Sequence, residues 1–258
     1  MGSPLKALSH KKTHLKMSPI KKITVFLLET LGDQLWGFKP NLMRAFVSQQ
    51  GARRSLCWFA KNMPKYERTL EAWGPIRTHL VATAVSTLNG CAYSTVGHAY
   101  ALQLHYLKNT DRLFPLTSAE IFRLHTLSEP EFLERWEQVL NQAGLGQEIF
   151  PLQRMVELRR NRGLAVTKGD RNMLHLITMI EDLNVCGVSD NVRSDQAHDP
   201  INKNRAIRDR YAALRNSQQQ SALYAQQAGK MSRQLPFQPL APTSQHPRLG
   251  KTILAPDD

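Results

Sequence analysis

The chain has 258 residues, a formal net charge of +13 and 41% hydrophobic residues. This composition excludes a wholly disordered chain, a collagen and a coiled-coil rod, because it contains enough apolar residues for a packed core. No apolar run reaches the roughly 18 to 20 residues that a membrane span needs. The most apolar N-terminal stretch is interrupted by Thr24, Glu29 and Thr30. We therefore expect neither export nor contact with a membrane.

The three cysteines, Cys57, Cys91 and Cys186, are too few and too widely spaced for a disulfide framework. This usage is typical of the reducing cytoplasm, which is the predicted location. Met17-Ser18-Pro19 reads like a natural start, so residues 1–16 are expected to precede the natural protein.

The positive charge lies in the two flanks. Residues 1–22 hold six lysines and no acid, and residues 151–258 hold 16 basic and 10 acidic residues. Residues 23–150 are nearly balanced, with 12 basic and 11 acidic residues. Such flanks favour weak, nonspecific and salt-dependent contact with nucleic acid. The ordinary alternative is a pair of solvated tails that keep the protein soluble.

Helical periodicity covers most of the chain, and the alternation expected of strands is nearly absent. We predict an all-α fold, a compact bundle of short helices with basic flanking tails. The helices are expected at residues 22–32, 41–49, 52–62, 75–88, 91–108, 119–127, 129–143, 150–160 and 170–185.

The central pair, 75–88 and 91–108, is expected to form the core. Gly74-Pro75 opens its first helix and Asn89-Gly90 ends it. Ser128 and Glu131 match a capping box for a later helix.

Composition divides the chain into four predicted parts. A basic N-terminal extension that we expect to be disordered covers 1–21, and the helical domain covers 22–186. An accessory region with a polar helix follows at 187–231, and a Pro-rich tail that we expect to be disordered covers 232–258.

The stretch around the central turn carries the predicted chemistry. Cys91 follows a glycine break and opens a helix, where unpaired backbone amides favour a thiolate. Ser94 and His98 lie three and seven residues further on, hence on the same helical face. A reactive Cys91 is one interpretation, and a buried cysteine in a tight helix contact is the ordinary alternative.

The sequence of residues 84–98, AVSTLNGCAYSTVGH, resembles the motif of the alkylhydroperoxidase D-like and carboxymuconolactone decarboxylase-like family. Residues 38–46, FKPNLMRAF, look like an early helix of that family, and the resemblance covers about residues 30–145. It implies an all-helical fold, a homo-oligomer (trimer or hexamer) and, in the redox branch, peroxide reduction by a cysteine pair.

The resemblance assigns four candidate catalytic positions, and this chain departs from the pattern at two of them. Cys91 matches the first cysteine and His98 matches the histidine. Ser94 stands where the second cysteine would be, and His79 replaces the upstream glutamate. Serine cannot form a sulfenic acid or a disulfide, so the dithiol cycle cannot run as usual. His79 can still pass a proton.

Three functions follow from these residues. The first is a divergent, single-thiol peroxidase in which Cys91 reacts and an external thiol reduces it. The second is a catalytically silent, oligomeric binding or regulatory scaffold. The third is cysteine-independent acid/base chemistry on a small lactone or acid, with His98 and His79 moving protons.

Histidine spacing leaves a zinc site open as an alternative. His98 and His105 are seven residues apart on one helix, and His79 could lie near them, so three imidazoles could bind the ion. The ordinary alternative at each position is a buried or rim histidine. Our prediction includes no cofactor and no metal.

Overall fold

The computed structural model describes residues 17–234, and within that range it contains helices and no strand, which confirms the predicted all-α class. The α helices are α1 (Pro19–Trp36), α2 (Leu42–Gln50), α3 (Ala52–Leu88), α4 (Ala92–Thr110), α5 (Ser118–Arg123), α6 (Glu129–Ala143), α7 (Ile149–Arg160), α8 (Lys168–Ser189) and α9 (Arg205–Gln234). Four short 3₁₀ helices are η1 (Leu124–Thr126), η2 (Gly146–Glu148), η3 (Arg162–Leu164) and η4 (Pro200–Lys203). The chain divides into two units, one that ends at Arg215 and one that begins at Asn216.

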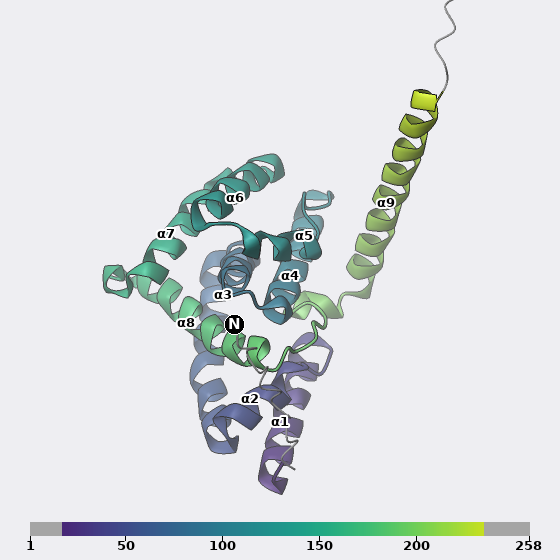
Figure 1. Cartoon of the computed structure of the whole chain (residues 1–258). Helices are drawn as coiled ribbons and strands as arrows, with labels where there is room; N and C mark the ends of the chain where they lie inside the picture. The colour runs from purple at the N-terminus through teal and green to yellow at the C-terminus, as the bar shows by residue number, and fades with distance from the viewer. Residues whose placement is uncertain (1–16, 235–258) are drawn as a thin grey trace, which may run out of the picture. The chain divides into compact units, whose positions relative to one another are not determined.

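The core is built on α3 and α4, which pack against each other as the sequence predicts (Figure 1). The predicted helix at 52–62 is too short, because it continues through Pro64 to Trp73. Gly74 then breaks the helix with a positive φ of 76°, and a second segment runs from Pro75 to Leu88. Figure 1 shows α1 and α2 near one end of α3. The helix α8 packs against both α3 and α4.

Local capping signals explain where several helices begin. The hydroxyl of Ser18 accepts the backbone N–H of Lys21, so α1 begins at Pro19 rather than at residue 22. The capping box of Ser128 and Glu131 opens α6, as predicted. The N-cap of α5 is Thr117, so this helix begins at Ser118, one residue before the predicted range of 119–127.

Buried apolar side chains form one large cluster and two smaller ones. The large cluster lies between α3, α4 and α5–α8, and Trp136 and Phe132 are fully buried in it. A second joins α1, α2 and α3 to Cys91 and Cys186. The third joins α4 to η4 and to the start of α9.

The segment between α8 and α9 lies against the core. Ala197 and Ile201 are buried with α4, and the His198 N–H donates to the carbonyl of Gly97 at 3.2 Å. Arg215 then donates to the carbonyls of Phe114 and Leu116. The compact unit therefore extends past residue 186, where the sequence places the end of the helical domain.

The two predicted tails fall largely outside the described residues, as residues 1–16 and 235–258 do. The helix α9 runs to Gln234, so the Pro-rich tail predicted from Ser232 begins inside it. Within the described range, no helix combines the length and hydropathy that crossing a membrane requires.

Candidate functional site

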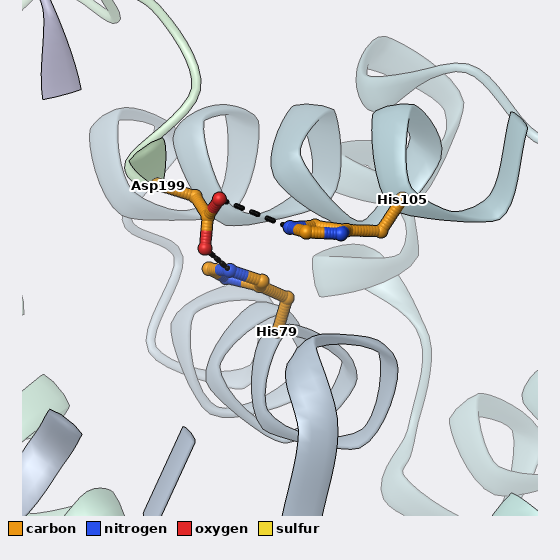
Figure 2. Close-up of side chains that lie close together, drawn as sticks. All are labelled: His79, His105 and Asp199. Carbon is orange, nitrogen blue, oxygen red and sulfur yellow. Dashed lines mark hydrogen bonds and ion pairs between the residues drawn. The ribbon is translucent and has the colours of Figure 1, made fainter. Parts of the chain in front are cut away.

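A buried aspartate joins two histidines from different helices (Figure 2). Asp199 is the N-cap of η4, His79 lies in the second segment of α3, and His105 lies on α4. The Nε2 of His79 is 2.8 Å from Oδ2 of Asp199, and the Nε2 of His105 is 3.0 Å from Oδ1. Each carboxylate oxygen therefore accepts from its own imidazole. His79 and Asp199 are buried, while the His105 side chain keeps 14% of its surface exposed.

A second contact extends this pair to His98. The two Nδ1 atoms of His79 and His98 are 3.2 Å apart. A carboxylate only accepts hydrogen bonds, so the proton of neutral His79 is on Nε2 and its Nδ1 is an acceptor. His98 must then carry its own proton on Nδ1, which leaves a lone pair on Nε2. That Nε2 makes no hydrogen bond within residues 17–234.

Burial and hydrogen bonding keep His79 and His98 neutral and Asp199 ionised at neutral pH. Burial lowers the pKa of His79, and the hydrogen bond to Asp199 only partly opposes this. Burial, together with the nearby imidazoles of His198 and His79, holds the pKa of His98 well below its usual value. Burial would raise the pKa of Asp199, but the hydrogen bonds from His105 and His79 outweigh it and lower that pKa. The result is a carboxylate with neutral His79 and His98.

His98 lines a small cavity of about 30 Å³ together with Tyr66 and Ser94. A site of this size has room for one or two water-sized groups. The hydroxyl of Tyr66 is buried and has no hydrogen-bond partner in the described part of the chain. An unpaired buried hydroxyl is costly, so the cavity suits a small polar molecule or group.

His198 closes one side of this cavity. Its ring stacks on Trp36 and Phe38 at 5.6 and 6.0 Å between centroids, and its Nε2 lies 2.8 Å from Oδ1 of Asp195. A Cβ added at Gly97 would come within 2.3 Å of the His198 ring. Only glycine allows α4 and this ring to approach so closely.

Cys91 lies apart from the histidines, although it shares α4 with His98. It is the N-cap of α4, it is 1% exposed, and its Sγ lies 2.7 Å from where a Cβ of Gly187 would be. Its thiol donates to the Ser94 hydroxyl over 3.6 Å. Burial raises the pKa of Cys91, so the expectation that the helix start would lower it is wrong.

The four candidate residues therefore fall into two places. His79 and His98 are in direct contact, and Cys91 and Ser94 are in direct contact. Ser94 connects the two pairs, since it also lines the cavity of His98.

The ligand atoms of His79, His105 and Asp199 lie within 4.8 Å of one another, so these residues could hold a metal ion. Two imidazoles and a carboxylate are donors that suit zinc. This set differs from the three imidazoles that the sequence singles out, because Asp199 takes the place of His98. An ion there would replace both hydrogen bonds to Asp199.

Sequence reasoning missed Asp199, His198 and Tyr66. Asp199 supplies the carboxylate that seemed absent when His79 replaced the glutamate of the family pattern. One local signal was present, because Asp199-Pro200 is typical of a helix start, and its side chain accepts the Ile201 N–H at 2.7 Å. That signal predicts a cap, and it says nothing about a contact with His79.

Comparisons of the chain with protein-family models, with curated proteins and with solved structures give no match, so the resemblance seen in residues 84–98 stays a prediction.

Proposed function

We propose that this protein is an acid/base catalyst in which His98 takes a proton from a small polar molecule or group in the cavity. The observation that carries the proposal is the hydrogen-bonded series from His98 through His79 to Asp199, whose free end is the lone pair on His98 Nε2. Neutral histidine beside a buried carboxylate is a common design for a general base. This is the third of the functions that the sequence leaves open.

The proton transfer can be written with every proton accounted for. The substrate proton goes to Nε2 of His98, and the proton on its Nδ1 passes to Nδ1 of His79. His79 then becomes an imidazolium whose Nε2–H still donates to the Asp199 carboxylate, which offsets the new charge. The reverse transfer returns the proton to the product.

The test is deuterium exchange in D₂O, followed by NMR, at the carbon beside the carbonyl of small acids and lactones. General-base catalysis contributes about 10² to 10⁴-fold, so His98→Gln should lower the exchange rate by at least about 100-fold. His125→Gln changes an exposed histidine outside the cavity and should leave the rate unchanged. Equal rates in wild type and His98→Gln would remove His98 as the base.

Single-thiol peroxide chemistry is a second candidate, supported by the Cys91–Ser94 contact beside the same cavity. It needs a thiolate, an external thiol as reductant and access of peroxide to Cys91. Burial of Cys91 and its raised pKa make it the weaker candidate. Peroxide consumption that is lost in Cys91→Ala, together with carbon–deuterium exchange that His98→Gln leaves unchanged, would reverse this ranking.

The effect of added zinc distinguishes a proton relay, meaning the hydrogen-bonded series His98–His79–Asp199, from a metal centre that uses some of the same residues. An ion on His79, His105 and Asp199 would take Nε2 of His79 away from the carboxylate and change the state of the relay. Added Zn²⁺ should therefore inhibit the exchange reaction. Activation by zinc, with loss of activity on treatment with a chelator, would favour the metal centre.

A homo-oligomer remains part of the proposal, and the exposed side of α1 supports it. The apolar pairs Leu42/Phe46 and Leu56/Phe59 on the short helices 41–49 and 52–62 are the faces for which the sequence predicts cover by a partner. Leu42, Phe46 and Phe59 are buried within one chain, whereas Leu56 is exposed. On α1, by contrast, five large apolar side chains are exposed: Ile20, Ile23, Phe26, Leu27 and Leu31. Light scattering of wild type and Phe26→Glu tests this, and a monomer of wild type at micromolar concentration would refute it.

A further inference from the structure

A groove of about 580 Å³ lies between α3 and α8, and no step of the proposed relay uses it. From α3 it is lined by Arg54, Lys61 and Lys65, and from α8 by Arg171 and His175. The three α3 cations are seven and four residues apart, so they repeat along one face of the helix. The volume lies within the range of small-ligand sites.

The charge of the groove is strongly positive and largely uncompensated. Arg54, Lys61 and Lys65 are exposed, and none of them forms an ion pair within residues 17–234. Asp182 is the one acid among the described lining residues, and its Oδ2 accepts the Nε1–H of Trp58 at 2.9 Å. The groove therefore presents cations that an anion could bind without first displacing a carboxylate.

The positive charges around the groove also affect the pKa of His175. Burial lowers it first, and the charges of Lys65, Lys61 and Arg68 lower it further. The Nε2 of His175 is 2.9 Å from the amide oxygen of Asn62, so a hydrogen bond holds this ring in place in the lining of the groove.

Trp58 adds an aromatic surface to these cations. Its ring packs on Phe46 and Phe59 at 5.0 Å between centroids, and the partly exposed side of Trp58 lines the groove. The Asp182 hydrogen bond fixes the indole edge. A rigid aromatic ring beside several cations is the combination that binds nucleotides, with the base against the ring and the phosphates on the cations.

We propose that the α3–α8 groove binds a nucleotide, with its phosphates on Lys61, Lys65 and Arg171 and its base against Trp58. Either a free nucleotide or a unit of a single-stranded nucleic acid would supply this chemistry. Along the sequence the net positive charge lies in the two flanks. In the folded chain, these cations of α3 and α8 line one groove.

Cys57 makes the proposal testable without a known activity. It lines the groove and is exposed, whereas Cys91 and Cys186 are buried. The alkylation rate of Cys57 in the full chain is measured with ADP, with a short oligothymidylate and with inorganic pyrophosphate. We expect ADP or the oligonucleotide to slow alkylation, and whichever acts at the lower concentration identifies the source of the nucleotide.

Two double variants with equal loss of charge provide the control. Lys61→Gln with Lys65→Gln should weaken protection by at least about tenfold, because two charge-assisted contacts are lost. Lys39→Gln with Lys108→Gln removes two exposed lysines outside the groove and should leave protection unchanged.

Three results would overturn the proposal. The first is that neither ADP nor the oligonucleotide protects Cys57, and the second is that both double variants lose protection equally. The third is that pyrophosphate protects as well as ADP, which would leave Trp58 without a base.

Discussion

Two places on α4, seven residues or about two helix turns apart, have opposite surroundings. At its start, Cys91 is packed against the backbone of α8 at Gly187 within an apolar cluster. In its middle, His98 contacts His79, which in turn contacts the carboxylate of Asp199. Burial makes the thiol harder to ionise and keeps the imidazole neutral. A neutral thiol is a poor nucleophile, whereas a neutral imidazole is a competent base, so burial disfavours one function and permits the other.

The largest expected effect on stability comes from Asp199→Ala. The change leaves the buried Nε2–H group of His79 and the partly buried one of His105 without an acceptor, so we expect the free energy of unfolding to fall by about 2 to 5 kcal/mol. Urea unfolding measures it. Cys91→Ala removes one sulfur from the apolar end and should cost about 1 to 2 kcal/mol. An Asp199→Ala chain as stable as wild type would show that the carboxylate is not bound as described.

Acidification is expected to lower the free energy of unfolding. The folded-state pKa values of His79 and His98 are lowered, so the unfolded chain binds more protons than the folded chain below about pH 6.5. Stability is therefore present above that pH and is lost on acidification. Between pH 7.5 and 5.5 the loss should reach up to about 1.4 kcal/mol for each of these histidines.

His98→Gln provides the control for this measurement, because it removes one of the two titrating groups. The slope of unfolding free energy against pH should fall by up to half in this variant. An unchanged slope would mean that His98 is protonated alike in the folded and unfolded chains.

A third effect, of similar size, is expected at Gly97, which lies against the His198 ring. The methyl group of Gly97→Ala would overlap the His198 ring, so the ring or α4 must move, at a cost of about 1 to 3 kcal/mol. Gly187→Ala is the matched change at the Cys91 end, where the neighbour is a thiol. The chemical shifts of His98 should move in Gly97→Ala and stay in Gly187→Ala. Movement in both variants would show that the two ends of the helix are coupled.

The smallest expected change is in thiol labelling. Cys57 should be alkylated first at pH 7, because Cys91 and Cys186 are buried. His98→Gln should leave the labelling rate of Cys91 within about twofold of wild type, since no hydrogen bond joins these residues in the described chain. Fast labelling of Cys91 that slows in His98→Gln would show that Cys91 and His98 act together in one redox site.

Local patterns in the sequence were sufficient to predict most of the helices. Periodic apolar residues place α4, and the capping box of Ser128 and Glu131 places the start of α6, because caps and amphipathic faces depend on neighbours three or four residues away. The contact of His79 with His98 was also foreseeable, since both lie on the predicted central pair of helices.

What only the tertiary structure decided depends on residues far apart in the chain. Asp199 is 120 residues from His79, and no periodicity relates the two positions. The burial of Cys91 depends on Gly187 of α8, and the charge of the groove depends on Arg171 facing the lysines of α3. Local sequence sets helix ends and faces, whereas the pKa of a group is set by what packs against it from elsewhere.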